Sequence, residues 1–241
     1  MGSACGPVAT TGTTLKANSP NCPTGRCGLK LDGLTGKTYE VYIDQTYDGG
    51  GWVMVINNTW VSGGMRNLTY SDAVNSVNYR VSEVPVTTIK NKTIAQFNAF
   101  LGVKYWFGLC QNITPGYMYI VQFVSSSAKE LNDTGNHTKR YRWRSTQFTG
   151  TYQFQAAGGV SDETGTGAPG LLTYHAANQY NLTTYDNDQD PYAPINCSQS
   201  YGNNPWWYGA CWSGSYYGYD NGVYWDGSSS DSHSYGAVYI K

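Results

Sequence analysis

The chain has 241 residues, enough for one large domain with a buried core, and a net charge of -1. This balance excludes a protein that binds a run of phosphates, because no surplus of Lys and Arg exists to neutralise them. Charged residues make up 13% of the chain while Tyr, Trp and Gly are abundant, a composition that also excludes a coiled coil or a helical bundle.

Residues 1–28 are rich in Thr, Gly, Pro and Cys and show no periodicity. We expect them to form a leader or the end of a stalk, held by disulfides. The six cysteines lack the spacing of a zinc site, which favours disulfides and secretion into an oxidising, extracellular compartment. No stretch of about 18 apolar residues occurs, so we expect no insertion into a membrane.

The next segments predict a hairpin followed by one helix. Residues 37–44 alternate as a strand does, and a second strand is expected over 52–56. Between them, the glycine run at 48–51 predicts a turn with several positive φ angles. Apolar residues spaced three, three and one apart over 94–101 predict a short amphipathic helix.

Three alternating segments, 118–124, 140–147 and 151–157, predict an antiparallel meander. After residue 158 the regular pattern fades, and no helix is predicted there. A stretch so poor in aliphatic residues has to be organised by something other than a standard core. The residues present could organise this stretch by binding a metal ion, by forming a disulfide or by stacking aromatic rings.

Three carboxylates on alternate residues, Asp186, Asp188 and Asp190, form the sharpest local motif. They repel one another unless water or a cation neutralises them, and hard oxygen ligands favour calcium over a transition metal. The spacing is not that of an EF-hand, because Pro191 stands where that loop needs Gly. An acidic surface loop that binds nothing remains the alternative.

Aromatic residues crowd the C-terminal third, beginning with Trp206, Trp207 and Tyr208. Such rings either pack in a core that lacks Leu and Val or stay exposed, where they can stack on sugars. We expect some of the group to be exposed. The sequence marks no catalytic nucleophile, since neither Gly-x-Ser-x-Gly nor His-Glu-x-x-His occurs, and the chain is not expected to be an enzyme.

The order of these landmarks resembles the fibrinogen-related (fibrinogen C-terminal-like) domain family, in particular its ficolin and tachylectin-type lectins. The similar segments are Val41–Trp52, Tyr105–Leu109, Gly158–Ser161, Leu172–His175, Thr183–Asp188, Cys197–Tyr201, Trp206–Cys211 and Gly222–Trp225. The resemblance implies an α+β fold dominated by antiparallel sheet, with short helices. It implies a fibrinogen-like domain over 29–241, of which about 181–241 forms a loop-rich, calcium-binding subdomain.

The resemblance also implies the residues of the site. Ca²⁺ would be held by Asp186, Asp188, Asp190 and Asn196, with carboxylates from the first two and backbone carbonyls between Asp190 and Asn196. The loop before Cys197 is longer here than is usual in the family. The implied ligand-binding residues are Tyr201, Ala210, Cys211, Trp212, Tyr219, Asp220 and His233.

The cysteines and the pocket depart from the family pattern. A disulfide between Cys197 and Cys211 is implied, and Ile43 stands where the family's opening motif has Cys. Three pairings stay open for the other cysteines, which are Cys5, Cys22, Cys27 and Cys110. Trp212 replaces the His of many members that bind acetyl groups, and Asp220 replaces a small apolar residue of some.

The resemblance implies a secreted, calcium-dependent lectin that recognises glycans on cell surfaces, with acetylated and sialylated sugars among the candidates. A homo-oligomer such as a trimer is expected, because single sugar sites bind weakly and gain from avidity. One alternative is a fibrinogen-like domain that binds a protein or a peptide end. Another is the tip adhesin of a bacterial or phage fibre with a different host ligand.

Overall fold

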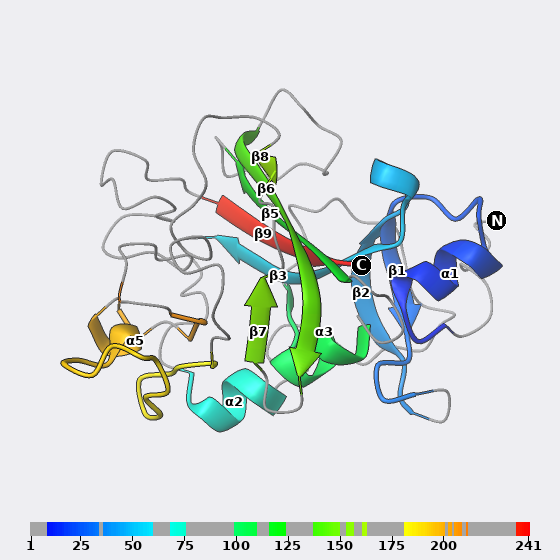
Figure 1. Ribbon diagram of the computed structural model, residues 1–241. Helices are drawn as coiled ribbons and strands as arrows, with labels where there is room; N and C mark the ends of the chain where they lie inside the picture. Colours follow the sequence, from blue (N-terminus) through cyan, green and yellow to red (C-terminus); the bar gives the residue numbers. More distant parts are fainter. Residues whose placement is uncertain are drawn as a thin grey trace.

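The described residues of this computed structural model are 9–33, 36–59, 68–75, 99–109, 116–123, 137–149, 153–156, 161–162, 181–200, 202–203, 205–208, 211 and 235–241. They form a nine-stranded antiparallel sheet with short helices around it (Figure 1). This arrangement confirms the predicted α+β fold dominated by antiparallel sheet.

The main path of the sheet runs in the order β1-β2-β3-β9-β5-β6-β7. Its strands are β1 (Gly25–Leu29), β2 (Tyr39–Asp44), β3 (Trp52–Thr59), β5 (Gly116–Phe123), β6 (His137–Thr149), β7 (Gln153–Ala156) and β9 (Tyr235–Ile240). Off this path, β4 (Ala99–Phe100) pairs with β3 and β8 (Ser161–Asp162) pairs with β6. The predicted hairpin and the predicted meander are therefore confirmed.

The C-terminal strand β9 lies between β3 and β5 and joins the two parts of the sheet (Figure 1). Ile240 pairs with Val53 of β3 on one side and with Met118 of β5 on the other. Residues 237–240 are all buried. The sequence pattern predicted no strand here, because a short strand covered on both faces loses the alternation that marks a half-buried one.

The helices are α1 (Gly12–Asn18), α2 (Tyr70–Asn75), α3 (Val103–Leu109) and α5 (Cys197–Ser200), with a 3₁₀ turn η1 at Tyr47–Gly49. The helix predicted over 94–101 is wrong at its C-terminal end, where Ala99 and Phe100 pair with β3 and Leu101 N donates to Val55 O. Residues 91–98 lie outside the described part. The single turn of α5 also corrects the expectation of no helix after residue 158.

The predicted glycine turn between β2 and β3 is confirmed. Gly49, Gly50 and Gly51 have φ angles of 79°, 75° and 82°, which L side chains rarely adopt. At Gly50 a Cβ atom would also lie 2.3 Å from the carbonyl oxygen of Gln45. Glycine is therefore required there for two independent reasons.

The described part of the N-terminal segment, residues 9–28, packs against the rest of the domain. Strand β1 runs across the predicted boundary at residue 28, and Leu15 and Cys27 are buried in the common core. Cys22 is disulfide-bonded, but its Sγ lies 3.7 Å from that of Cys27, so these two are not bonded to each other. Burial raises the pKa of the Cys27 thiol to about 11. Cys5 and Cys110 lie outside the described residues.

Helix α3 connects the sheet to the C-terminal loops. Trp106 of α3 is buried, its indole N–H donates to Leu101 O, and its ring lies 5.4 Å from that of Trp207. This contact places the aromatic segment around Trp207 against the main core. Within the described residues, no helix is long and apolar enough to cross a membrane.

Candidate functional site

The segment 181–190 begins with a short antiparallel bridge to Trp206. Thr183 N donates to Trp206 O over 2.9 Å, and Trp206 N donates to Thr183 O over 3.0 Å. A turn follows, in which Thr184 and Asn187 exchange backbone hydrogen bonds of 3.0 and 3.2 Å. The bridge and the turn together fix the backbone that carries the three predicted carboxylates.

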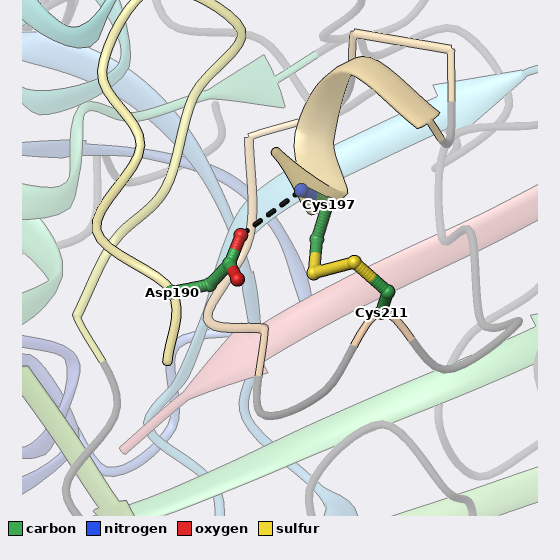
Figure 2. A group of neighbouring side chains, drawn as sticks. All are labelled: Asp190, Cys197 and Cys211. Atoms are coloured by element: carbon green, nitrogen blue, oxygen red, sulfur yellow. Dashed lines mark hydrogen bonds between the residues drawn. A yellow bond between two sulfur atoms is a disulfide. The ribbon is translucent and has the colours of Figure 1, made fainter. Parts of the chain in front are cut away.

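Asp190 lies beside the disulfide between Cys197 and Cys211, as Figure 2 shows. Its Oδ1 accepts a hydrogen bond of 2.9 Å from Tyr192 N, and its Oδ2 accepts one of 2.9 Å from Cys197 N. The disulfide confirms the predicted pairing. Because the two sulfur atoms are bonded to each other, their closeness to Asp190 does not make a thiolate metal site. The carboxylate instead accepts hydrogen bonds from the backbone at both ends of the loop 191–196.

The carboxylate of Asp188 neighbours that of Asp190. Asp188 is exposed, and its Oδ1 accepts a hydrogen bond of 3.3 Å from Asp190 N. Burial raises the pKa of the Asp190 carboxyl, and the Asp188 carboxyl raises it as well, against the lowering effect of the Cys197 and Tyr192 N–H groups. Two carboxylates this close repel each other, and a hard cation bound to both would remove the repulsion.

Asp186 has a different role in the structure. Its Oδ1 accepts hydrogen bonds from Tyr70 N over 2.9 Å and from Thr184 Oγ1 over 2.7 Å. Tyr70 is the first residue of α2, so Asp186 binds the first N–H group of that helix from a segment 116 residues away, while Thr69 is the N-cap that accepts from Asp72 N. One oxygen of this predicted metal ligand is therefore engaged in holding the loop against α2.

Replacing Asp186 with alanine is expected to lower the free energy of unfolding by about 1 kcal/mol, because α2 loses the carboxylate that binds its first N–H group at the positive end of its dipole. Urea denaturation without calcium, followed by circular dichroism, measures this loss. Asp188→Ala is the matched control, since it removes a neighbouring exposed carboxylate that caps no helix. Equal losses in the two variants would contradict this role.

The Asn196 side chain closes the same loop. Its Nδ2 donates to Thr184 O over 3.0 Å, and its Oδ1 accepts from Gln199 N over 3.1 Å at the start of α5. Gln199 Nε2 in turn donates to Tyr185 O over 2.8 Å. The backbone carbonyl of Asn196 accepts from Ser200 N over 3.1 Å, so both oxygens of this predicted metal ligand already hold the start of α5.

Of the predicted ligand-binding residues, the structure describes only Cys211. Its φ angle is 36°, a left-handed conformation that is uncommon outside glycine. The disulfide to Cys197 therefore holds a strained position next to the predicted pocket. The predicted residues that lie outside the described part are Tyr201, Ala210, Trp212, Tyr219, Asp220 and His233.

The aromatic run at 206–208 belongs to the core. Trp206, Trp207 and Tyr208 are between 1% and 3% exposed. The ring of Trp207 lies 5.4 Å from that of Trp106 and 5.5 Å from that of Trp206. These three side chains are packed in the core next to the site segment, so none of them is available to stack on a ligand.

The side chains of the loop 191–195 were given no role from the sequence. All five of its residues are exposed, and Tyr192 and Ile195 are 42% and 46% exposed. The family resemblance marked this stretch as an insertion and assigned only its backbone carbonyls to the calcium site. The signal that could have drawn attention to it is a run of five uncharged residues, two of them prolines, directly after an acidic motif.

Comparisons with known proteins agree with this architecture. The family model described as the C-terminal globular domain of fibrinogen beta and gamma chains matches residues 125–240. The fibrinogen-like globe domain of human ANGPTL6 is 18% identical with a TM-score of 0.67, over 100% of this chain and 98% of that one. That of human ANGPTL2 is 20% identical with a TM-score of 0.61, over 97% of this chain and 98% of that one.

The D-dimer of lamprey fibrin, solved with the peptide ligand Gly-His-Arg-Pro-amide, is 13% identical with a TM-score of 0.66, over 97% of this chain and 73% of that one. Among the curated proteins, none matches the sequence significantly. The matched structures show that the chain has the fibrinogen C-terminal-like fold.

Proposed function

We propose that this domain of fibrinogen C-terminal-like fold is a secreted, calcium-dependent lectin and not an enzyme. The observation that carries the proposal is the pair of neighbouring carboxylates of Asp188 and Asp190. Asp188 is exposed to the solvent from which an ion would come, and Asp190 is held in place by two backbone N–H groups. Both oxygens of Asp190 and one oxygen of Asp186 already accept hydrogen bonds, so the exposed carboxylate of Asp188 is the ligand that an ion would reach first.

The residues around the pair define what a cation would do here. Bound Ca²⁺ would supply positive charge that neutralises both carboxylates. Asp190 would stay ionised and fixed in place, so its hydrogen bond with Cys197 N and the disulfide would hold the position of Cys211, one of the predicted ligand-binding residues. The ion therefore acts on the ligand site through the shape of the loop. The glycan is bound by side chains of the C-terminal loops.

Chelation tests the proposal directly. At calcium concentrations 100-fold above Kd, an ion that binds only the folded state stabilises it by about 2.7 kcal/mol. For a domain of this size, that shift corresponds to a rise in Tm of roughly 5–10 °C relative to EDTA. A glycan array that carries acetylated and sialylated sugars should show binding in calcium and none in EDTA.

Asp188→Asn is expected to abolish both the thermal shift and the glycan signal. Asp32→Asn is the matched control, since it removes the charge of an exposed carboxylate near β1 that accepts from Tyr39 Oη, while the asparagine can still accept there, and it should keep both. If EDTA leaves the melting curve unchanged, the domain does not bind calcium and that part of the proposal is wrong. If EDTA leaves glycan binding unchanged, the glycan site does not depend on the ion.

A peptide-binding domain is the second candidate. It is favoured by the likeness to the fibrin D-dimer, which was solved with a bound peptide. Isothermal titration with Gly-His-Arg-Pro-amide distinguishes the two functions, because a lectin should not bind this peptide. In either case we propose that several copies of the domain act together, since linked weak sites gain affinity from avidity.

A further inference from the structure

A thiol and a disulfide are in contact in the core near the start of the chain. Cys27 lies in β1, carries a thiol and is 2% exposed. Cys22 lies just before β1, is 9% exposed and is disulfide-bonded. The two Sγ atoms are 3.7 Å apart, and the Cys27 thiol is the donor in this contact because the bonded sulfur of Cys22 carries no proton. The thiol therefore contacts a sulfur of a disulfide to which it does not belong.

The disulfide of Cys22 is a long-range cross-link. Apart from the bonded pair of the C-terminal site, the sequence has two further cysteines, Cys5 and Cys110, so one of them is the partner of Cys22. They are 17 and 88 positions from Cys22, whereas Cys27 is 5 positions away. A bond from Cys22 to Cys27 would close a much shorter loop and would release the distant cysteine from its cross-link.

Burial holds the thiol in its unreactive form. A thiolate attacks a disulfide and a thiol does not, and burial raises the pKa of Cys27 to about 11. The segment 19–24, which carries Cys22, contains turns and no helix or strand. Such a segment opens locally more easily than the strands of a sheet. Opening admits water to the two sulfur atoms, which favours the thiolate while they remain neighbours in the chain.

We propose that this pair is a disulfide switch, in which Cys27 replaces the present partner of Cys22. The Cys27 thiol gives its proton to water, and its sulfur attacks the Sγ of Cys22. The bond from Cys22 to its partner breaks, and the partner leaves as a thiolate that takes up a proton. One thiol is consumed and one is released, so the step needs no oxidant or reductant. The switch is independent of the proposed lectin function.

Peptide mapping without reduction tests the switch. Arg26 lies between the two cysteines, so trypsin places Cys22 and Cys27 on the separate peptides 17–26 and 27–30. The full chain is held in urea below its unfolding transition, quenched in acid, alkylated with N-ethylmaleimide and digested. We expect two linkages of Cys22, one to its distant partner and one to Cys27. The share of the second should rise severalfold in urea and return when urea is removed, because opening allows the exchange in both directions.

Cys27→Ser should abolish the labelling of the distant partner by N-ethylmaleimide in the same urea. Cys27→Ala serves the same purpose if a buried serine unfolds the domain. Thr24→Ser is the matched control, since it lies beside the pair, keeps the thiol and should match the wild type. The link between Cys197 and Cys211 should stay constant in every sample.

Four results would each overturn the switch. The first is a single linkage of Cys22 at every urea concentration. The second is a ratio of two linkages that does not respond reversibly to urea, because it describes isomers fixed during folding. The third is equal labelling of the distant partner in Cys27→Ser and in the wild type. The fourth is a link between isotopically heavy and light copies, because it assigns the exchange to a contact between chains.

Discussion

Replacing Trp207 with alanine is expected to lower the free energy of unfolding by about 3–5 kcal/mol, the range for deletion of a large buried aromatic side chain. Trp207 is 1% exposed and packs against the rings of Trp106 and Trp206. Removing it leaves a cavity between α3 and the C-terminal loops. Urea denaturation followed by circular dichroism measures the change. Tyr192→Ala, at an exposed position, is the control and should cost little.

The same substitution should also weaken calcium binding. Trp206, the neighbour of Trp207, forms the backbone bridge to Thr183 that starts the segment of the carboxylates. If the packing under Trp206 loosens, the carboxylates lose their fixed positions, and the rise in Tm with calcium should shrink. A loss of unfolding free energy below about 1 kcal/mol would show that Trp207 is not the packed core residue described here.

The strands could be predicted where the sequence alternates between apolar and polar residues or where a glycine turn marks a hairpin. Strands β2 and β3 flank a glycine turn, and β5, β6 and β7 follow one another as a meander. The spacing over 94–101 fitted a helix as well as a strand edge. Ala99 and Phe100 form a strand because they pair with β3, 42 and 44 residues away in the chain, and sequence periodicity carries no information on such a contact.

The site, too, could be predicted from the sequence only in part. The alternating carboxylates and the disulfide are visible in the sequence because their members lie within 25 residues of one another. The bond from Asp186 to the first N–H group of α2 is not visible, because Tyr70 lies 116 residues away. The sequence also could not separate buried aromatic residues from exposed ones, since burial depends on what packs against each ring. Trp207 is buried and Tyr192 is exposed, although both occur in the same polar, proline-containing stretch.

Replacing Cys197 and Cys211 together with serine is expected to lower the free energy of unfolding by about 3 kcal/mol, as the chain-entropy model gives for a loop of this length. The two residues are 14 apart in sequence. The loss should appear in urea denaturation under non-reducing conditions. A double variant as stable as the wild type would contradict it.

The double variant should lose ligand binding by more than its stability loss explains. The disulfide holds Cys211 at a φ of 36°, and a serine released from that bond is free to return to an ordinary backbone conformation. Cys197 N would remain bonded to Asp190, because the backbone N–H is unchanged. Calcium binding should therefore survive in part, as a reduced rise in Tm, while glycan binding is lost. If both are lost in parallel, the disulfide supports the metal loop itself rather than the ligand side of the site.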